Sequence, residues 1–339
     1  MPCIEVVEVL VKRGCADLTN LLDDSTSFPV ANGGLGDVFS GQLRDGTPVA
    51  IKTIRTHYDP HRSARVYHKQ AAKEIYTWSK CKHPNVVGLV GLAVFRDCLA
   101  MISRWQENGT LPQYLSKNPS ANRCKLSTSI CAGLVYLHDN DIVRTLFIRH
   151  HNLRALLRLL TCCILAGARR PKRTLLQANV LVSKDGTAML ADFGNATMLY
   201  TSLQFTQSST SITSTPRWTA PEILEGLTRH TEAGDVYSLG MTILETFTSK
   251  VPFPDKVDLA LIFHVVLQKS IPTRPNKIIP PKSIDGDRLW SILTKCWTYN
   301  PKNRPIARGI WEGIKSITPD TLMVIGGKAE GKLKDNSKE

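Results

Sequence analysis

Hydrophobic residues follow different patterns in the two halves of the chain. From Phe28 to about Ser103, short apolar runs rich in β-branched residues, such as TPVAIKTI at 47–54, alternate with polar turns, and one helical pattern covers 63–81. From about Glu107 onward the apolar residues recur at helical spacing over longer segments. The clearest helical segments are 126–140, 235–249 and 288–297. The pattern therefore predicts an α+β chain, with a small β-rich lobe that holds one helix and a larger, mainly helical lobe.

The two ends of the chain differ from this body. Residues 1–27 start with closely spaced apolar residues that fit a short helix or a strand, and they carry no recognisable chemistry. Residues 318–339 are rich in Gly, Lys and Glu, which predicts a charged, flexible and solvated tail. We therefore expect the folded domain between them, at about 28–317.

Composition is that of a folded protein. The 339 residues are 42% hydrophobic and 21% charged, enough apolar material for a sizeable core in one large domain or two lobes. No apolar run reaches the roughly 18 to 20 residues that span a bilayer, and no signal-peptide pattern stands at the N-terminus. The nine cysteines show no paired spacing, so reduced thiols are expected. These features predict a cytoplasmic protein without a membrane partner.

The net charge of +14 is misleading because it is concentrated in one place. Residues 143–177 hold eight Arg or Lys and no Asp or Glu, which leaves a modest excess elsewhere. Aromatic residues do not alternate with the basic ones, and no zinc-finger spacing is present. We expect no nucleic-acid partner, although a basic nucleic-acid binder stays as a third alternative.

A glycine-rich turn, ANGGLGDVF at 31–39, is the first candidate for chemistry. Glycine lacks a Cβ, so backbone N–H groups in such a turn can approach a phosphate closely. A plain hairpin turn is the alternative. The sequence VAIK at 49–52 follows at hairpin distance and favours a phosphate site, because it brings the ammonium of Lys52 to the turn. A lysine on a strand can otherwise simply be solvated.

Two carboxylates extend this candidate site. Glu74 lies in the predicted helix and can reach Lys52 to hold it, although a surface glutamate is the more ordinary interpretation. Asp192, in ADFGNA, follows a short strand-like run as a Mg²⁺ ligand at a strand end would, although it could be a turn residue. The order of all these features along the chain favours the functional interpretation.

In this order the motifs resemble those of the eukaryotic protein kinase family, of the tyrosine-kinase-like or Ser/Thr type. The matching motifs are the glycine-rich loop, VAIK, the helix glutamate, HPN at 83–85, DFG at 192–194, APE at 220–222, GDVYSLG at 234–240 and NPKNRP at 300–305. The resemblance covers about 28–317 and implies a two-lobed fold that binds ATP and Mg²⁺. It divides the domain into an N-lobe at 28–103, a hinge at 104–106 and a C-lobe at 107–317.

The resemblance also implies roles for individual residues. Lys52, Glu74 and Asp192 are the catalytic residues, with Lys52 on the phosphates, Glu74 anchoring Lys52 and Asp192 on the metal. The implied nucleotide contacts are Gly33, Gly34, Gly36, Val38, Ala50, Lys52, Ser103, Arg104 and Gln106, and the implied metal ligands are Asn179 and Asp192. Glu222 and Arg304 are expected to form a buried structural ion pair. Ala31 departs from the family pattern, which usually has a glycine there.

The catalytic loop of the family is disrupted in this chain. Kinases place His-x-Asp-x-x-x-x-Asn before the strand at VLV, and Asn179 fits the last position. The Asp is missing, and 143–177 contains no carboxylate that could orient and accept the proton of an attacking hydroxyl. As written, the chain is expected to be catalytically impaired.

Two explanations compete for this anomalous segment. It is either a real insertion that makes a pseudokinase, or an intron translated together with the catalytic loop in a shifted frame. Codons can be chosen for ARRPKRT at 168–174 so that reading one base later gives His-Gly-Asp-Leu-Lys-Gly. The flanking bases can carry intron-like ends, and their removal restores the frame. We favour the second hypothesis, which the transcript sequence would test.

The functional expectation is a protein kinase that transfers the ATP γ-phosphate to Ser or Thr of proteins once the loop is intact. The recovered Asp-Leu-Lys-Gly resembles Ser/Thr kinases more than tyrosine kinases. A nucleotide-binding signalling scaffold, a pseudokinase, is the alternative. The ten Ser or Thr within 201–215 fit a flexible polar loop better than a phosphorylation switch. The sequence does not identify the protein substrate, the pathway or the oligomeric state.

Overall fold

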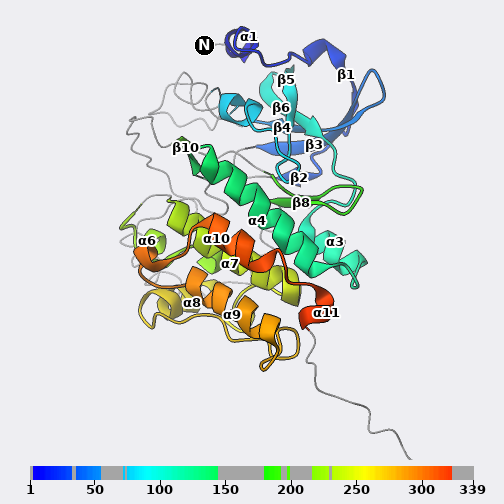
Figure 1. Ribbon diagram of the computed structural model, residues 1–339. Helices are drawn as coiled ribbons and strands as arrows, with labels where there is room; N and C mark the ends of the chain where they lie inside the picture. The colour runs from blue at the N-terminus through cyan, green and yellow to red at the C-terminus, as the bar shows by residue number, and fades with distance from the viewer. Residues whose placement is uncertain are drawn as a thin grey trace, which may run out of the picture.

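The structure is a computed structural model that describes residues 3–32, 36–54, 72, 75–143, 179–191, 197–198, 216–228 and 231–322. Within these residues the chain forms a β-rich lobe and a larger helical lobe (Figure 1). This confirms the predicted two-lobed α+β fold.

A six-stranded antiparallel sheet forms the β-rich lobe. Its strand order is β1-β3-β4-β6-β5, and β2 pairs with β3. The strands are β1 Leu22–Ser25, β2 Ala31–Asn32, β3 Asp37–Leu43, β4 Pro48–Thr53, β5 Leu89–Phe95 and β6 Cys98–Arg104. On β4, Val49, Ile51 and Thr53 are buried and alternate with more exposed residues, as a strand with one face on a core requires. The sheet starts at Leu22, so the lobe begins earlier than the expected boundary at Phe28.

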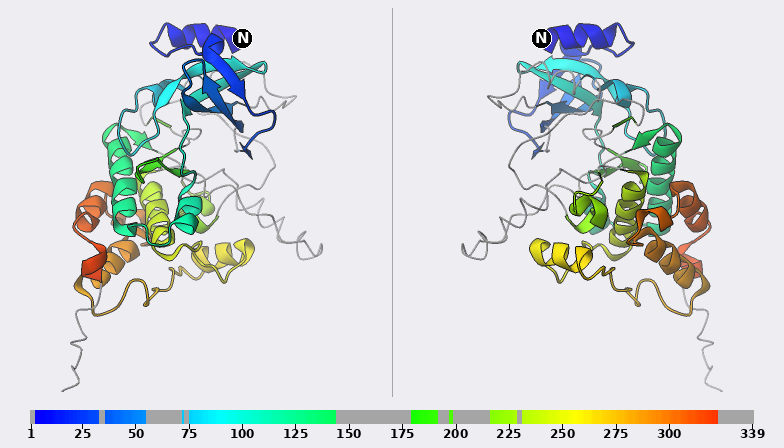
Figure 2. Two further views of the ribbon diagram at one scale, coloured as in Figure 1. Left: turned by 90° about the vertical axis from the view of Figure 1, so that its right-hand side faces the viewer. Right: turned by 90° about the vertical axis from the view of Figure 1, so that its left-hand side faces the viewer.

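The N-terminal segment is part of this lobe. Helix α1, Cys3–Val11, buries Val6, Val7 and Leu10, and the one-turn 3₁₀ helix Thr19–Leu21 leads into β1. Figures 1 and 2 show α1 at the end of the sheet that faces away from the helical lobe. The predicted helix at 63–81 is described only in part: Ala72 and residues 75–79 are helical, and the remainder of 63–74 lies outside the described residues.

The helical lobe is built around α7. Its helices are α3 Leu111–Lys117, α4 Arg123–Asp139, α6 Pro221–Leu224, α7 Glu232–Thr248, α8 Asp258–Val266, α9 Ile284–Cys296, α10 Ala307–Ile314 and α11 Pro319–Leu322, with 3₁₀ turns at Pro216–Trp218 and Pro301–Asn303. Every residue of α7 from Gly234 to Phe247 is buried, so this helix is the axis of the lobe. A Cβ at Gly240 would lie 2.7 Å from Trp297 Nε1, which shows how closely the chain after α9 packs on α7.

Capping residues explain where the three long helices begin. The side chains of Asn122, Thr231 and Ser283 accept hydrogen bonds from the backbone N–H groups of Lys125, Gly234 and Gly286. Each bond satisfies an N–H that has no partner inside its helix. The predicted helices at 126–140, 235–249 and 288–297 are therefore confirmed, and α4, α7 and α9 each start three to four residues before the apolar pattern does.

Two further two-stranded sheets are formed by residues between 142 and 198. Strand β7, Ile142–Val143, pairs with β10, Thr197–Met198. Strand β8, Val180–Val182, pairs with β9, Ala188–Leu190. Strand β7 stands at the start of the basic segment and β8 shortly after its end, and residues 144–177 of the segment lie outside the described residues.

The C-terminal boundary also differs from the expectation. Residues 319–322 form α11, Leu322 is buried, and Ser283 donates to the carbonyl oxygen of Thr321 at 3.3 Å. The predicted tail from 318 onward is thus folded as far as Leu322. In the part of the chain that the structure describes, no helix combines the length and apolar character needed to cross a bilayer.

Candidate functional site

Lys52 lies in the middle of the sheet. It pairs with Val38 on β3 and with Met101 on β6. Ala50, two residues earlier on the same strand, pairs with Ser103. Side chains directly opposite in an antiparallel sheet share a face, as do alternate residues of one strand. The predicted contacts Val38, Ala50, Lys52 and Ser103 therefore lie on one face. Ser103 is buried, and Lys52 is half-buried.

The glycine-rich turn is held against the strand that carries Lys52. Strands β2 and β3 form a hairpin whose turn contains Gly36, with Ala31 opposite Val38. A Cβ at Gly36 would lie 1.4 Å from the carbonyl oxygen of Thr53, so only glycine fits at this position. The hydroxyl of Thr53 also donates to the carbonyl oxygen of Asp37 at 3.1 Å. Gly33 and Gly34, the other two predicted glycines, lie outside the described residues.

Residues 104–106, predicted as the hinge, lie where β6 ends and the chain continues to the helical lobe. The N–H of Trp105 donates to the carbonyl oxygen of Pro48 at 3.1 Å, which fixes the hinge to β4. The side-chain amide of Gln106 donates to the carbonyl oxygen of Arg104 at 3.1 Å. The carbonyl oxygen of Gln106 accepts from the N–H of Gly109 at 3.0 Å. This segment is therefore ordered by its own hydrogen bonds and lies beside Pro48 and Val49, at the start of β4.

The β8–β9 hairpin places Asn179, one of the two predicted metal ligands, against Ala191. The N–H of Ala191 donates to the carbonyl oxygen of Asn179 at 2.8 Å. Ala191 immediately precedes Asp192, which itself lies outside the described residues, as does Glu74. The hairpin is joined to the start of the helical lobe, because the N–H of Val182 donates to the carbonyl oxygen of Gly109, three residues after the hinge, at 2.9 Å. The hairpin thus connects Asn179 to Gly109, which follows the last strand of the sheet that carries Lys52.

Asn85 has a role that the sequence did not reveal. Its side-chain amide donates to the carbonyl oxygen of Ala188 at 3.0 Å, and its own carbonyl oxygen accepts from the N–H of Leu190 at 2.8 Å. Asn85 therefore anchors the strand that leads to Asp192. The HPN motif pointed to this position, but its partners are about a hundred residues away in sequence.

His83 supports Asn85 from the same motif. Its Nδ1 accepts from the backbone N–H of Asn85 at 3.1 Å, and its ring stacks on Tyr136 of α4 with centroids 4.8 Å apart. Burial lowers the pKa of His83 below its usual range. The neutral ring is the form that this geometry requires, because a protonated Nδ1 cannot accept a hydrogen bond.

The predicted structural ion pair is confirmed. Arg304 donates from both terminal nitrogens to the two carboxylate oxygens of Glu222, each at 2.7 Å. The guanidinium also donates to the carbonyl oxygens of Thr298 and Ala233, at 2.8 and 2.9 Å. The Arg304 side chain is 0% exposed and that of Glu222 6%. The pair joins α6 to the start of α7 and the segment before α10.

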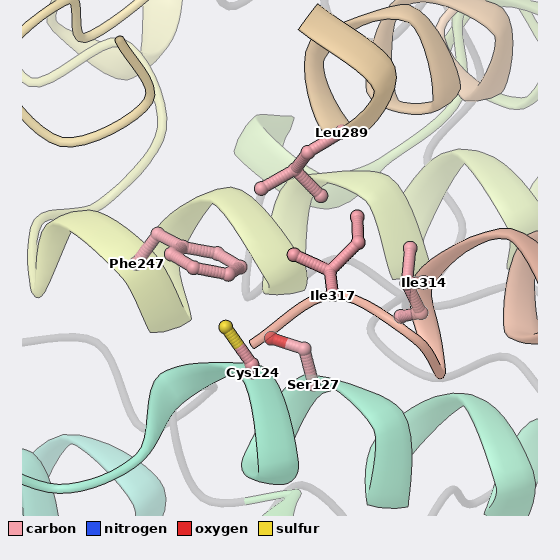
Figure 3. Close-up of a pocket in the computed structure, with 6 residues that line it drawn as sticks. All are labelled: Cys124, Ser127, Phe247, Leu289, Ile314 and Ile317. Carbon is pink, nitrogen blue, oxygen red and sulfur yellow. The ribbon is translucent and has the colours of Figure 1, made fainter. Parts of the chain in front are cut away.

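A gap in the helical lobe is not a second ligand site. It lies between α4, α7, α9 and the end of α10 and is lined by Cys124, Ser127, Phe247, Leu289, Ile314 and Ile317 (Figure 3). It has no room for a water molecule. Burial raises the pKa of Cys124 to about 11, so its thiol is not a nucleophile at neutral pH. The hydroxyl of Ser127 has no hydrogen-bond partner among the described residues.

Two families of known proteins match this chain. The family described as protein tyrosine and serine/threonine kinase matches residues 26–155, and the one described as protein kinase domain matches residues 173–313. The chain belongs to the eukaryotic protein kinase family. The interval between the two matches, 156–172, falls inside the basic segment of this kinase.

Curated relatives include kinases of both specificities. The kinase is 27% identical over 312 residues to serine/threonine-protein kinase STY46 of Arabidopsis thaliana. This alignment covers 91% of this chain and 46% of the relative. It is 27% identical over 289 residues to tyrosine-protein kinase Fer of Rattus norvegicus, with 84% and 30% covered. It is 28% identical over 290 residues to mitogen-activated protein kinase kinase kinase 3 of Arabidopsis thaliana, with 84% and 41% covered. The chain spans less than half the length of each of these relatives.

Proposed function

We propose that this kinase binds ATP and Mg²⁺ between the sheet and the β8–β9 hairpin, and that its intact gene product phosphorylates Ser or Thr of proteins. The observation that carries the proposal is the shared face of Val38, Ala50, Lys52 and Ser103 beside the hinge. That face has the apolar and cationic groups that a purine and its phosphates need. The serine/threonine relatives support the choice of acceptor residue.

Each residue keeps one role in this proposal. The ammonium of Lys52 pairs with the phosphates, and Glu74 holds Lys52 in place. Gly33, Gly34 and Gly36 let backbone N–H groups approach the phosphates. The backbone of Arg104–Gln106 binds adenine, with Ser103 behind it. Mg²⁺, held by Asn179 and Asp192, would neutralise the phosphate charge when it is bound.

The residues described by the structure fit such ligands. A backbone turn without Cβ atoms lets N–H groups approach phosphates closely. Gly36 lies against the backbone of Thr53, the residue after Lys52. A hard cation needs oxygen ligands, and Asn179 is joined by its carbonyl oxygen to the residue before Asp192. The kinase domain that we propose extends from about Leu22 to Leu322, slightly wider than the expected 28–317. A cytoplasmic location remains part of the proposal.

The given sequence lacks one group that phosphate transfer requires. The carboxylate that accepts the proton of the attacking hydroxyl is missing from 143–177. The unmatched interval 156–172 supports the interpretation that foreign residues interrupt the kinase here. Strands β7 and β8 flank the place where a short catalytic loop would stand.

A loop replacement tests this proposal. Residues 143–177 are exchanged for Val-His-Gly-Asp-Leu-Lys-Gly, and a second chain carries the same loop with Asn in place of its Asp. We expect phosphate transfer from ATP to a generic Ser/Thr substrate only with the Asp loop, whereas all three chains bind ATP. Transfer by the chain as written, or none by the Asp loop despite ATP binding, would contradict the proposal.

The second candidate function is a pseudokinase scaffold. The missing carboxylate favours it if the transcript encodes all of 143–177. Lys52 and Asn179 would then still bind nucleotide, and signalling would depend on contacts instead of transfer. Sequencing the transcript across this region separates the two candidates. A transcript that lacks the segment supports the active kinase, and one that encodes all of 143–177 supports the pseudokinase.

A further inference from the structure

The start of helix α1 lies against the turn between β5 and β6. The thiol of Cys3 donates to the carbonyl oxygen of Asp97 at 3.6 Å. Cys98, the next residue, is the first of β6 and pairs with Phe95. Two cysteines that are far apart in sequence therefore come from neighbouring elements at the outer end of the β-rich lobe (Figure 2).

Both cysteines are held by ordered structure. The turn consists of Arg96 and Asp97, with φ of 51° and 60°, which is the left-handed geometry of a tight two-residue hairpin. The guanidinium of Arg96 lies over the rings of Phe39 and Phe95, at 4.6 and 4.9 Å. On the other side, α1 is fixed by its buried residues. Their separation is thus set by the fold and not by a flexible terminus.

Exposure distinguishes this pair from the other cysteines. Among the cysteines that the structure describes, Cys3 and Cys98 are partly exposed. The remainder are buried: Cys15, Cys81, Cys124, Cys131 and Cys296. Burial raises the pKa of Cys98, and the nearby Cys3 and Asp97 raise it further. Cys98 is therefore a thiol at neutral pH that reacts slowly unless a partner sulfur is presented to it.

We propose that Cys3 and Cys98 form a reversible disulfide when a peroxide is present, and that this bond ties α1 to the β5–β6 turn. Hydrogen peroxide oxidises one thiol to a sulfenic acid and releases water. The second thiol then attacks that sulfur, an S–S bond forms and a second water leaves. Two thiols lose two electrons and two protons in total, and the peroxide is reduced to two waters.

The bond would stabilise the lobe that carries Lys52. It closes a loop of most of the N-terminal lobe and so lowers the entropy of the unfolded chain. It also prevents α1 from leaving the sheet. The segment after α1 reaches the helix that follows Glu74, because the guanidinium of Arg13 lies 5.5 Å from the ring centroid of Tyr76. The disulfide thus acts on the β-rich lobe from outside the proposed ATP site, and its formation does not depend on whether ATP binds there.

The test uses the whole chain at low concentration, with the Cys3→Ser and Cys98→Ser variants as matched controls. After brief treatment with hydrogen peroxide, the protein is digested without reductant and its peptides are identified by mass. We expect one cross-linked pair that contains Cys3 and Cys98, a loss of two reactive thiols, and a rise of about 5 °C in the unfolding temperature. Dithiothreitol reverses all three, and neither serine variant shows them.

Two results would overturn the proposal. One is a wild-type chain whose Cys3 and Cys98 become oxidised separately, without a cross-linked peptide. The other is a cross-link that appears only between two chains, as judged by size under non-reducing conditions. A single serine variant that is still stabilised by peroxide would equally exclude this pair as the cause.

Discussion

The backbone N–H of Ala191 donates to the carbonyl oxygen of Asn179 at 2.8 Å. This bond closes the β8–β9 hairpin and sets the residue before Asp192 directly against Asn179. Strand β8 of the hairpin is tied to Gly109, which follows the hinge, and strand β9 is tied to Asn85. The metal side of the proposed site is therefore positioned by backbone bonds that do not involve the anomalous segment.

Gly36 provides a test of the glycine-rich turn. In Gly36→Ala the new Cβ would clash with the carbonyl oxygen of Thr53, so the turn must move away from β4. We expect a loss of about 2 kcal/mol in the free energy of unfolding and about tenfold weaker ATP binding, measured by denaturation and calorimetry. Gly88→Ala is the matched control, because nothing lies within 4 Å of a Cβ there. Equal effects in both variants would refute the role of the close contact.

Breaking the ion pair between Glu222 and Arg304 is expected to be costly. Either Glu222→Ala or Arg304→Ala leaves a buried charge without its partner, and we expect each to lower the free energy of unfolding by about 3–5 kcal/mol. The double variant should lose much less than the sum of the two. Asp139→Ala, which removes an exposed partner of Arg308, should cost less than about 1 kcal/mol. Additive losses from Glu222 and Arg304 in chemical denaturation would mean that they do not act as a pair.

The lowered pKa of His83 predicts that the stability of the protein depends on pH. Burial lowers the pKa of His83 in the folded protein below the usual histidine value of 6.5, so between about pH 7 and 5 the unfolded chain binds the proton first. Stability should therefore fall as the pH falls through this range. In His83→Gln this contribution is absent, and the difference in unfolding free energy between pH 7.5 and 5 should shrink. A variant whose stability falls as steeply as that of the wild type would show that His83 is not responsible.

Ser127 predicts a substitution that stabilises the protein. Its hydroxyl is buried without a hydrogen-bond partner among the described residues, so Ser127→Ala should raise the free energy of unfolding by about 1 kcal/mol. Ser238 is the contrasting control, because its buried hydroxyl donates to the carbonyl oxygen of Trp218 at 2.6 Å. Ser238→Ala should be destabilised by a similar amount. Urea denaturation measures both, and a loss of stability in Ser127→Ala would be inconsistent with an unsatisfied hydroxyl.

Local sequence patterns predicted much of the fold. Helices α4, α7 and α9 follow from the apolar spacing, and the order of motifs placed Lys52 on the strand next to the glycine-rich turn. The ion pair of Glu222 with Arg304 came from the family resemblance and has the expected geometry. These features are encoded within short windows or in motifs whose order is characteristic of the family.

Features that depend on distant contacts could not be predicted. The segment CIEVVEVLV is rich in β-branched residues and fits a strand as well as a helix, and it becomes α1 because Val6, Val7 and Leu10 form one buried helical face against the sheet. No local pattern around Asn85 indicated that its side chain would bind the carbonyl oxygen of Ala188. Strand β1 and helix α11, of four residues each, lie outside the expected domain at 28–317 and are too short to show a clear apolar pattern.

The central claim is that Lys52 binds the phosphates of ATP on the face of the sheet that it shares with Val38, Ala50 and Ser103. Its most direct test is the shift in unfolding temperature on addition of ATP and Mg²⁺, compared among the wild-type chain, Lys52→Ala and Lys125→Ala, an exposed lysine on α4. We expect an increase for the wild type and Lys125→Ala, since a ligand that binds the folded state stabilises it, and no increase for Lys52→Ala at an unchanged starting temperature. An equal increase in all three proteins would contradict the account.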